Sequence, residues 1–143
     1  MKETYYLNEK TLPTIPVPHD CVIKEIRHGD EGIEFIFEDD ITRHDSAGHF
    51  APGAKSLIVR YHFADSPGDF SVCKWVKSKK PFSDDGCFRP LDNGRLTALT
   101  DGKFSLEYLY HNVGYCSVIT KLFADGLIIL DVRADRVELE WIY

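Results

Sequence analysis

Hydrophobic and polar residues alternate with a period of two along most of the chain. In one segment Ile33, Phe35 and Phe37 fall on the same face, which is the spacing of a β-strand. A β-branched run precedes this segment, and the turn-forming residues 29–32 separate the two. Two such runs joined by a short turn predict a β-hairpin over residues 20–38.

The same period recurs through the rest of the chain. In the segment 56–63 Leu57 and Val59 share a face, and in the last segment apolar residues alternate with Glu138 and Glu140. This alternation predicts strands with one buried and one wet face. The further predicted strands are 3–7, 70–77, 95–100, 103–110, 113–123, 127–133 and 137–143.

These runs amount to about nine or ten strands, which is more than one open sheet usually holds flat. No window of ten or more residues has a helical period, although 91–99 has room for one helical turn, and the prolines of 11–18 predict an extended lead-in. A chain of 143 residues fits one domain. The sequence therefore predicts a single all-β domain, residues 1–143, in which an antiparallel meander forms a two-sheet sandwich or a barrel.

The charge of the chain bears on its partners and on its location. The chain has 17 basic and 23 acidic residues, which gives a formal net charge of −6. This balance argues against nucleic-acid binding, and it suits a protein partner with a basic surface. The apolar runs are too short to span a bilayer and no apolar leader opens the chain, so we expect no membrane contact and a cytoplasmic location.

Two segments without a strand pattern, 39–53 and 78–93, are the candidates for function, since long loops often carry it. In the first, imidazoles and carboxylates gather within eleven residues and could hold an ion or a general base, but their spacing fits no known metal site. The second has a basic start and an acidic middle. The candidate binding residues are Asp39, Asp40, His44, Asp45, His49, Asp84 and Asp85.

No other pattern points to catalysis. The chain has neither a G-x-S-x-G elbow nor a phosphate-binding glycine loop, so no catalytic residue, metal or cofactor is predicted. The four cysteines form no C-x-x-C pair, which predicts structural thiols. The pair His19 and Asp20, just before the hairpin, is expected to have a structural role.

The hairpin also carries a family resemblance. A His-Asp pair, a hydrophobic strand, a Gly/Asp turn and a strand that ends in acidic residues resemble the opening of many small bacterial proteins of unknown function. Some of those are immunity proteins of polymorphic toxin systems. The ending Val137-Glu138-Leu139-Glu140-Trp141 is similar to theirs. The resemblance implies a partner-binding role and supplies no catalytic residue.

Three functions remain open on the sequence. The leading hypothesis is a non-enzymatic protein-binding module; its narrower form is an immunity-type protein that binds and blocks a partner. The second is a small-ligand-binding β-barrel, because the strands are rich in aromatic residues. The third is a metal-dependent hydrolase built on the loop 39–49.

Overall fold

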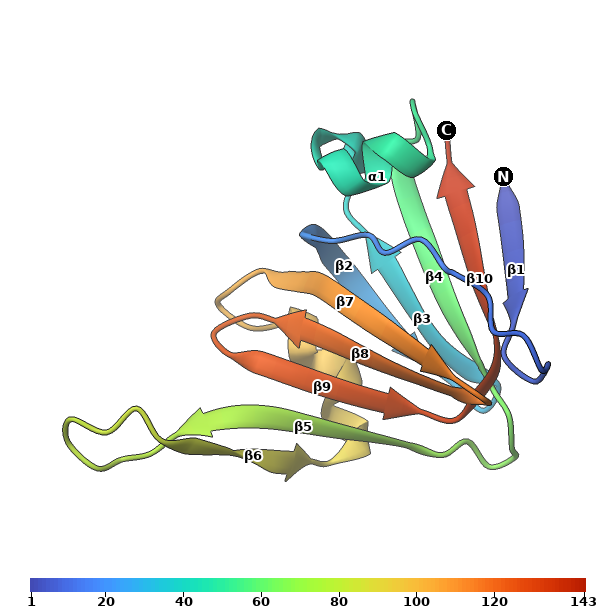
Figure 1. Cartoon of the computed structure of the whole chain (residues 1–143). Coiled ribbons are helices and arrows are strands. Elements are labelled where there is room, and N and C mark those ends of the chain that lie inside the picture. Colours follow the sequence, from blue (N-terminus) through green and yellow to red (C-terminus); the bar gives the residue numbers. More distant parts are fainter.

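The computed structural model describes residues 1–143 as one sheet of ten strands, ordered β1-β10-β4-β3-β2-β7-β8-β9-β5-β6 (Figure 1). All neighbouring strands are antiparallel. The strands are β1 (Lys2–Tyr6), β2 (Cys21–His28), β3 (Gly32–Phe37), β4 (Ser56–Phe63), β5 (Phe70–Lys77), β6 (Gly86–Leu91), β7 (Leu106–Gly114), β8 (Ser117–Phe123), β9 (Leu127–Val132) and β10 (Ala134–Ile142). The helical segments are η1 (Ile41–Arg43), α1 (Asp45–Phe50) and η2 (Asn93–Thr100). None of them has the length and apolar character needed to cross a membrane.

The sheet curls so strongly that strands far apart in it meet across the core. The Tyr61 hydroxyl of β4 lies 2.7 Å from Thr120 Oγ1 of β8, although β3, β2 and β7 separate these strands. At one end of the core the backbone N–H of Ala134 donates to the carbonyl oxygen of Cys116 at 3.2 Å. The result is two facing layers made from one sheet, whose edge strands β1 and β6 stay unpaired on their outer sides.

The layers separate where β2 changes its partner. Residues Cys21 to Ile23 pair with β7, whereas the rest of β2 pairs with β3 alone. A register shift between Ile23 and Glu25 marks this point, and bulges of this kind bend strands. The helix η2 packs against β2 and β5, strands of the two layers, and buries Leu96.

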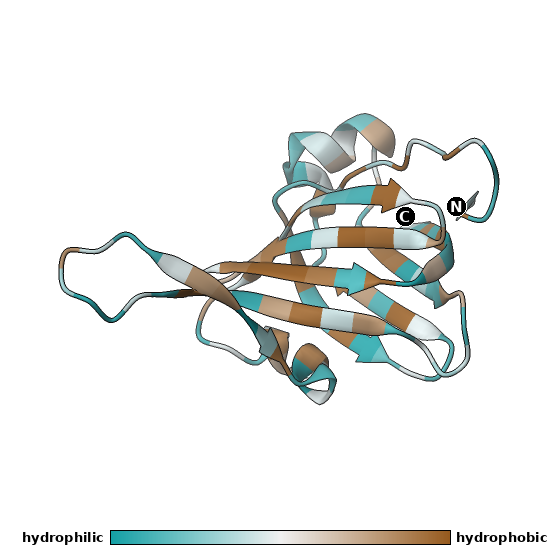
Figure 2. Ribbon diagram, turned by 60° about the horizontal axis from the view of Figure 1, so that its bottom comes forward, coloured by the Kyte–Doolittle hydropathy of each residue, from teal (hydrophilic) through white to brown (hydrophobic).

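The core is one cluster of 29 buried hydrophobic residues between the layers. Aromatic rings join the two sides: the ring centroids of Phe35 and Tyr108 are 6.1 Å apart, and those of Phe37 and Tyr108 are 5.8 Å apart. Figure 2 shows alternating brown and pale or teal bands along the long strands of the body. This alternation is the two-residue period of the sequence, with one face of each strand directed into the core.

A row of polar side chains crosses this core. His111 Nε2 lies 3.2 Å from the carbonyl oxygen of Ile15, so this nitrogen carries the proton and donates. His111 Nδ1 then accepts from the Tyr108 hydroxyl at 2.6 Å, Tyr108 accepts from Tyr61 at 2.6 Å, and Tyr61 accepts from Thr120 at 2.7 Å. Burial raises the pKa of Tyr61 to about 12 and that of Tyr108 well above its usual value, and it lowers the pKa of His111. Each member is satisfied and buried, which suits a stabilising role.

The predicted fold class is confirmed, since the chain is antiparallel and all-β with ten strands. Its two layers belong to one continuous sheet rather than to two, and the sheet does not close into a barrel because β1 and β6 do not meet. The predicted C-terminal meander holds for β7, β8 and β9. The last strand, β10, instead crosses to the space between β1 and β4.

Three local predictions were wrong. The predicted strand 95–100 is part of η2, whose first turn is capped by Asp92 accepting from the Gly94 N–H at 2.9 Å. The predicted loop 78–93 contains β6, and the predicted loop 39–53 contains η1 and α1. Each of these elements is short, and short elements owe most of their stability to tertiary contacts rather than to local pattern.

Candidate functional site

Two predicted residues meet the His-Asp pair beside α1. His44 and Asp45 line an open hollow of about 320 Å³ together with His19 and Asp20. The Ser46 hydroxyl donates to the carbonyl oxygen of His19 at 2.8 Å, which ties α1 to the start of β2. His19 Nε2 lies 3.6 Å from Asp20 Oδ1. The hollow has only polar lining and is open to solvent, so its groups keep their contact with water.

The other predicted residues lie apart from this hollow. Asp39 is exposed, and Asp40 adopts a left-handed backbone (φ 63°) before η1 without a side-chain capping bond. His49 lies exposed in the last turn of α1. Asp84 and Asp85 belong to the loop between β5 and β6, on another side of the molecule (Figure 1). No three His, Cys, Asp or Glu side chains are placed to hold a metal ion, and all four cysteines are free thiols.

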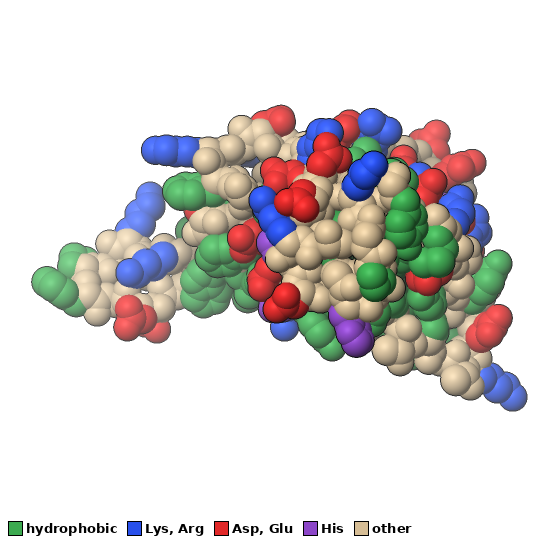
Figure 3. Space-filling view, turned by 90° about the horizontal axis from the view of Figure 1, so that it is seen from above, with side chains coloured by type: hydrophobic (Ala, Val, Ile, Leu, Met, Phe, Trp, Pro, Cys, Tyr) green, Lys and Arg blue, Asp and Glu red, His purple; other side chains and the backbone are tan.

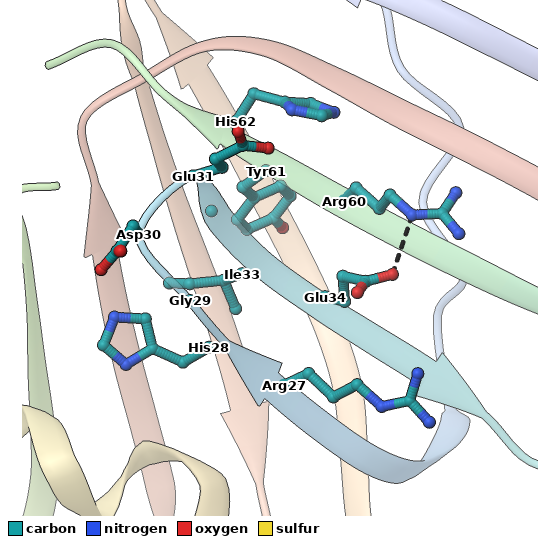
Figure 4. A pocket seen from close by; sticks show the side chains of 11 residues that line it. Arg27, His28, Gly29, Asp30, Glu31, Ile33, Glu34, Arg60, Tyr61 and His62 are labelled. Atoms are coloured by element: carbon teal, nitrogen blue, oxygen red, sulfur yellow. Dashed lines mark hydrogen bonds and ion pairs between the residues drawn. The ribbon is translucent and has the colours of Figure 1, made fainter. Parts of the chain in front are cut away.

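The outer side chains of β2, β3, β4 and β10 form what we call the charged face. Arg27 lies opposite Glu34, Glu34 opposite Arg60, and Arg60 opposite Glu138, so opposite charges follow one another across four strands. Directly opposite residues share a face of the sheet. Glu140, two residues beyond Glu138, completes the set. An open groove of about 470 Å³ lies over part of it (Figure 4).

The charges of this face are paired with one another. Arg60 Nε donates to Glu34 Oε2 at 2.8 Å, the bond drawn in Figure 4, and Arg60 Nη1 donates to Glu140 Oε2 at 2.5 Å. Glu138 Oε2 lies 3.2 Å from His62 Nε2 and 3.4 Å from Lys2 Nζ. Burial alone would raise the pKa of Glu138, but His62 and Lys2 together hold that pKa below its ordinary value. The charged face therefore satisfies itself and leaves little charge for a partner.

The outer face of β5, β6, β8 and β9 carries a set of apolar side chains, beside polar ones such as Lys121 and Asp131. Cys73 lies opposite Ile129, Trp75 opposite Phe88, and Phe123 opposite Leu127. On the inner side of these strands Val72, Leu130 and Leu122 are buried, so these six side chains point outward. We call this set the apolar strip: Cys73, Trp75, Phe88, Phe123, Leu127 and Ile129.

The aromatic members of the strip are open to solvent. Trp75 is 38% exposed, Phe88 40% and Phe123 42%. The rings of Trp75 and Phe88 meet edge to face with centroids 5.2 Å apart. A solvated face of an antiparallel sheet normally carries polar residues, so an exposed aromatic strip is unusual in this place.

From Trp75 on, β5 and β6 leave the body of the sheet and carry two members of the strip, Trp75 and Phe88, with them. The last residue of β5 that pairs with β9 is Lys74, and from there on β5 pairs with β6 alone. We call residues 75–89 the arm; it projects from the body in Figure 1. Its loop is mainly teal with one brown segment in Figure 2. Phe82 in that loop is fully exposed and has a left-handed backbone (φ 59°), which is rare for a bulky residue and often marks a functional site.

The arm differs from the body in charge. It holds four cations, Lys77, Lys79, Lys80 and Arg89, and two carboxylates, a net charge of +2 against −8 for the remaining residues. The four cations line one open hollow of about 980 Å³, and none of them is in an ion pair. Figure 3 shows the arm on the left, with blue side chains on its flanks and hydrophobic ones at its end.

Sequence reasoning located part of this region. The loop 78–93 is a recognition candidate on the sequence, with a basic start and an acidic middle, but the candidate residues taken from it are Asp84 and Asp85 and not its cations. The strip itself was missed, because Trp75 and Phe123 look like ordinary core residues of a strand. One signal was present: in the segment 70–77 the alternation breaks down at Trp75-Val76-Lys77, where all three side chains are exposed.

Comparison with known proteins adds no assignment to this geometry. The chain matches no protein-family model, no curated protein and no solved structure.

Proposed function

We propose that this protein is a non-enzymatic protein-binding module, and that the apolar strip together with the arm is its binding surface. The observation that carries the proposal is the strip, with three aromatic side chains between 38% and 42% exposed on the outer face of the sheet. Aromatic side chains supply most of the energy of protein interfaces. A contiguous exposed set of them marks a contact surface.

The energetics of the sheet support this assignment. The inner face of the same strands already contributes Val72, Leu122 and Leu130 to the core, so folding does not require large apolar groups on the outer face. Apolar groups on the surface instead make the molecule prone to aggregation. A partner that covers the strip removes this tendency to aggregate. The burial itself contributes about 25 cal/mol of favourable free energy for each Å² of apolar surface.

The filled interior argues against a small-ligand-binding barrel, and the polar hollow near α1 argues against a metal-dependent hydrolase. The space between the layers is filled by 29 buried hydrophobic residues, and a small-ligand site needs an apolar cavity of about 300 Å³ or more. Near α1, His44 and Asp45 share a hollow with His19 and Asp20, but no three of these side chains are placed to hold a metal ion. A hydrolase site there would need three converging protein ligands.

The finer form of the proposal is an immunity-type protein that blocks its partner. It rests on the resemblance of the N-terminal hairpin and on the geometry of the arm. A projecting hairpin with an exposed aromatic residue at its end can enter a cleft of a partner, and such an insertion excludes other molecules from that cleft.

The test is co-purification with the product of the neighbouring gene, with Phe123→Ser as the variant of the strip. Tyr6→Ser is the matched control, because Tyr6 is also an exposed aromatic residue but lies on β1 at the opposite edge of the sheet. We expect the Phe123 variant to lose the complex and the Tyr6 variant to keep it. A complex that survives Phe123→Ser, or equal losses in both variants, would sink the assignment of the strip.

A further inference from the structure

The cations of the arm form no ion pair with the rest of the fold. Lys77, Lys79, Lys80 and Arg89 line one hollow of about 980 Å³, with Asp85 as the carboxylate among its lining residues. Ion pairs elsewhere occupy the arginines of the charged face. Lys74, at the base of the arm, is paired with Asp125 at 2.5 Å.

We propose that this hollow binds an acidic segment of the partner protein, with several Asp or Glu side chains facing the four cations. This inference rests on the proposed function and specifies the chemistry of the partner. The argument is charge complementarity, since unpaired cations on a projecting element attract and orient an anionic surface. The expectation of a basic partner, drawn from the whole-chain charge of −6, does not hold for the arm, whose own charge is +2.

A short acidic segment fits this site better than a nucleic acid does. The body carries a net charge of −8, and a long polyanion that extends past the arm would meet that charge. None of the residues that line the hollow is aromatic, whereas single-stranded nucleic acids are commonly bound with their bases stacked on aromatic rings.

An anionic membrane fits less well for a related reason. Phe82 at the end of the arm is followed closely by Asp84 and Asp85, and both carboxylates are exposed. Inserting Phe82 into a headgroup layer would bring these two charges against anionic lipids. In a protein partner, a basic or hydrogen-bonding residue can face them while Phe82 enters an apolar pocket.

The experiment is a selection of phage-displayed random 12-residue peptides on the whole protein, followed by affinity measurements on synthetic versions of the enriched peptides. The variants are Lys79→Glu/Lys80→Glu for the hollow and Trp75→Ser for the strip. A thermal melt of each checks that it is folded. We expect enriched peptides with several Asp or Glu residues, whose affinity falls by about tenfold or more on charge reversal and falls with added salt.

The outcomes separate this inference from the proposed function. Enriched peptides that are neutral or basic, but that require Trp75, overturn the acidic partner and leave the binding module standing. Peptides that ignore both variants, or no enrichment at all, overturn both. Equal affinity of a dT12 oligonucleotide or of anionic phosphatidylserine vesicles through the same lysines overturns the choice of a protein segment. A homodimer that dissociates on charge reversal, seen by sedimentation, shows that the occupant is a second copy and overturns it as well.

Discussion

The two halves of the curled sheet present opposite outer surfaces. On β2, β3, β4 and β10 the outward side chains are charged and paired, as Arg60 is with Glu34 and Glu140. On β5, β6, β8 and β9 they include the exposed aromatic rings of Trp75, Phe88 and Phe123, beside polar side chains such as Lys121 and Asp131. Both halves bury their inner faces in the same core, so the fold itself does not demand this difference.

We relate the charged half to the stability of the fold and the apolar strip to the proposed binding. A charged row whose members satisfy one another gains little from a further partner, because a partner would have to displace existing ion pairs. On an exposed apolar strip, each Å² of apolar surface that a partner covers adds favourable free energy of binding. We therefore expect substitutions on the charged face to change the stability of the fold, and those on the strip to change binding.

The largest expected effect is on the charged half. A Cβ added at Gly32 would lie 2.1 Å from the carbonyl oxygen of Tyr61, so Gly32→Ala must push β3 away from β4. We expect the free energy of unfolding to fall by about 2 to 4 kcal/mol. Gly126→Ala is the matched control in the other half, where the nearest atom, the oxygen of Trp75, lies 3.5 Å away. Urea unfolding measures both, and similar losses in the two variants would refute the argument.

Removal of the two ion pairs of Arg60 is the next largest change. Arg60→Leu leaves Glu34 and Glu140 facing a methyl group, and we expect a loss of about 1 kcal/mol in unfolding free energy. Lys121→Leu, on β8, changes an exposed residue without an ion pair, and we expect a change within about 0.5 kcal/mol. If both variants melt like the parent in low salt, the charged row contributes nothing to stability.

Acid should weaken the charged face in a defined range of pH. The pKa of Glu138 is lowered from its ordinary value of 4.5. Its ionised form therefore contributes stability that is fully present above that ordinary value and is lost as the pH falls through the lowered pKa. We expect Glu138→Gln to be less stable than the parent near neutral pH and to lose less stability below about pH 4. A parallel decline in both proteins, followed by thermal melts at each pH, would contradict this role of Glu138.

The smallest expected change in stability belongs to the strip. Phe123 is 42% exposed, so Phe123→Ser should shift the free energy of unfolding by no more than about 0.5 kcal/mol. The same variant should bind less of a hydrophobic fluorescent dye and stay soluble at higher concentration, because it breaks the exposed patch. A large loss of stability would show that Phe123 belongs to the core.

The sequence predicted the elements whose pattern is local. The segments 56–63 and 70–77 coincide with β4 and β5, and the hairpin 20–38 contains β2 and β3. It missed β6, because Pro90 and the mixed polarity of that strand hide a pairing that depends on β5. Pro90 is tolerated there since β6 is an edge strand.

The candidate site was harder to predict for a different reason. Alternation tells which residues share a face of one strand, but not which strands lie side by side. Trp75 and Phe123 become one strip only because β5, β9 and β8 are neighbours. In the same way, Arg60 meets Glu140 only because β10 crosses the sheet to pair with β4. Both facts depend on long-range topology.

The most direct test of the account is hydroxyl-radical footprinting of the free protein and of its complex with the co-purified partner, read by mass spectrometry. Exposed aromatic side chains lie on the apolar strip and also on β1, at the opposite edge of the sheet. The account predicts that Trp75, Phe82, Phe88 and Phe123 become protected in the complex, while Tyr6 on β1 reacts as before. Protection of Tyr6 with no change at Trp75 and Phe123 would contradict the claim that the apolar strip and the arm form the binding surface.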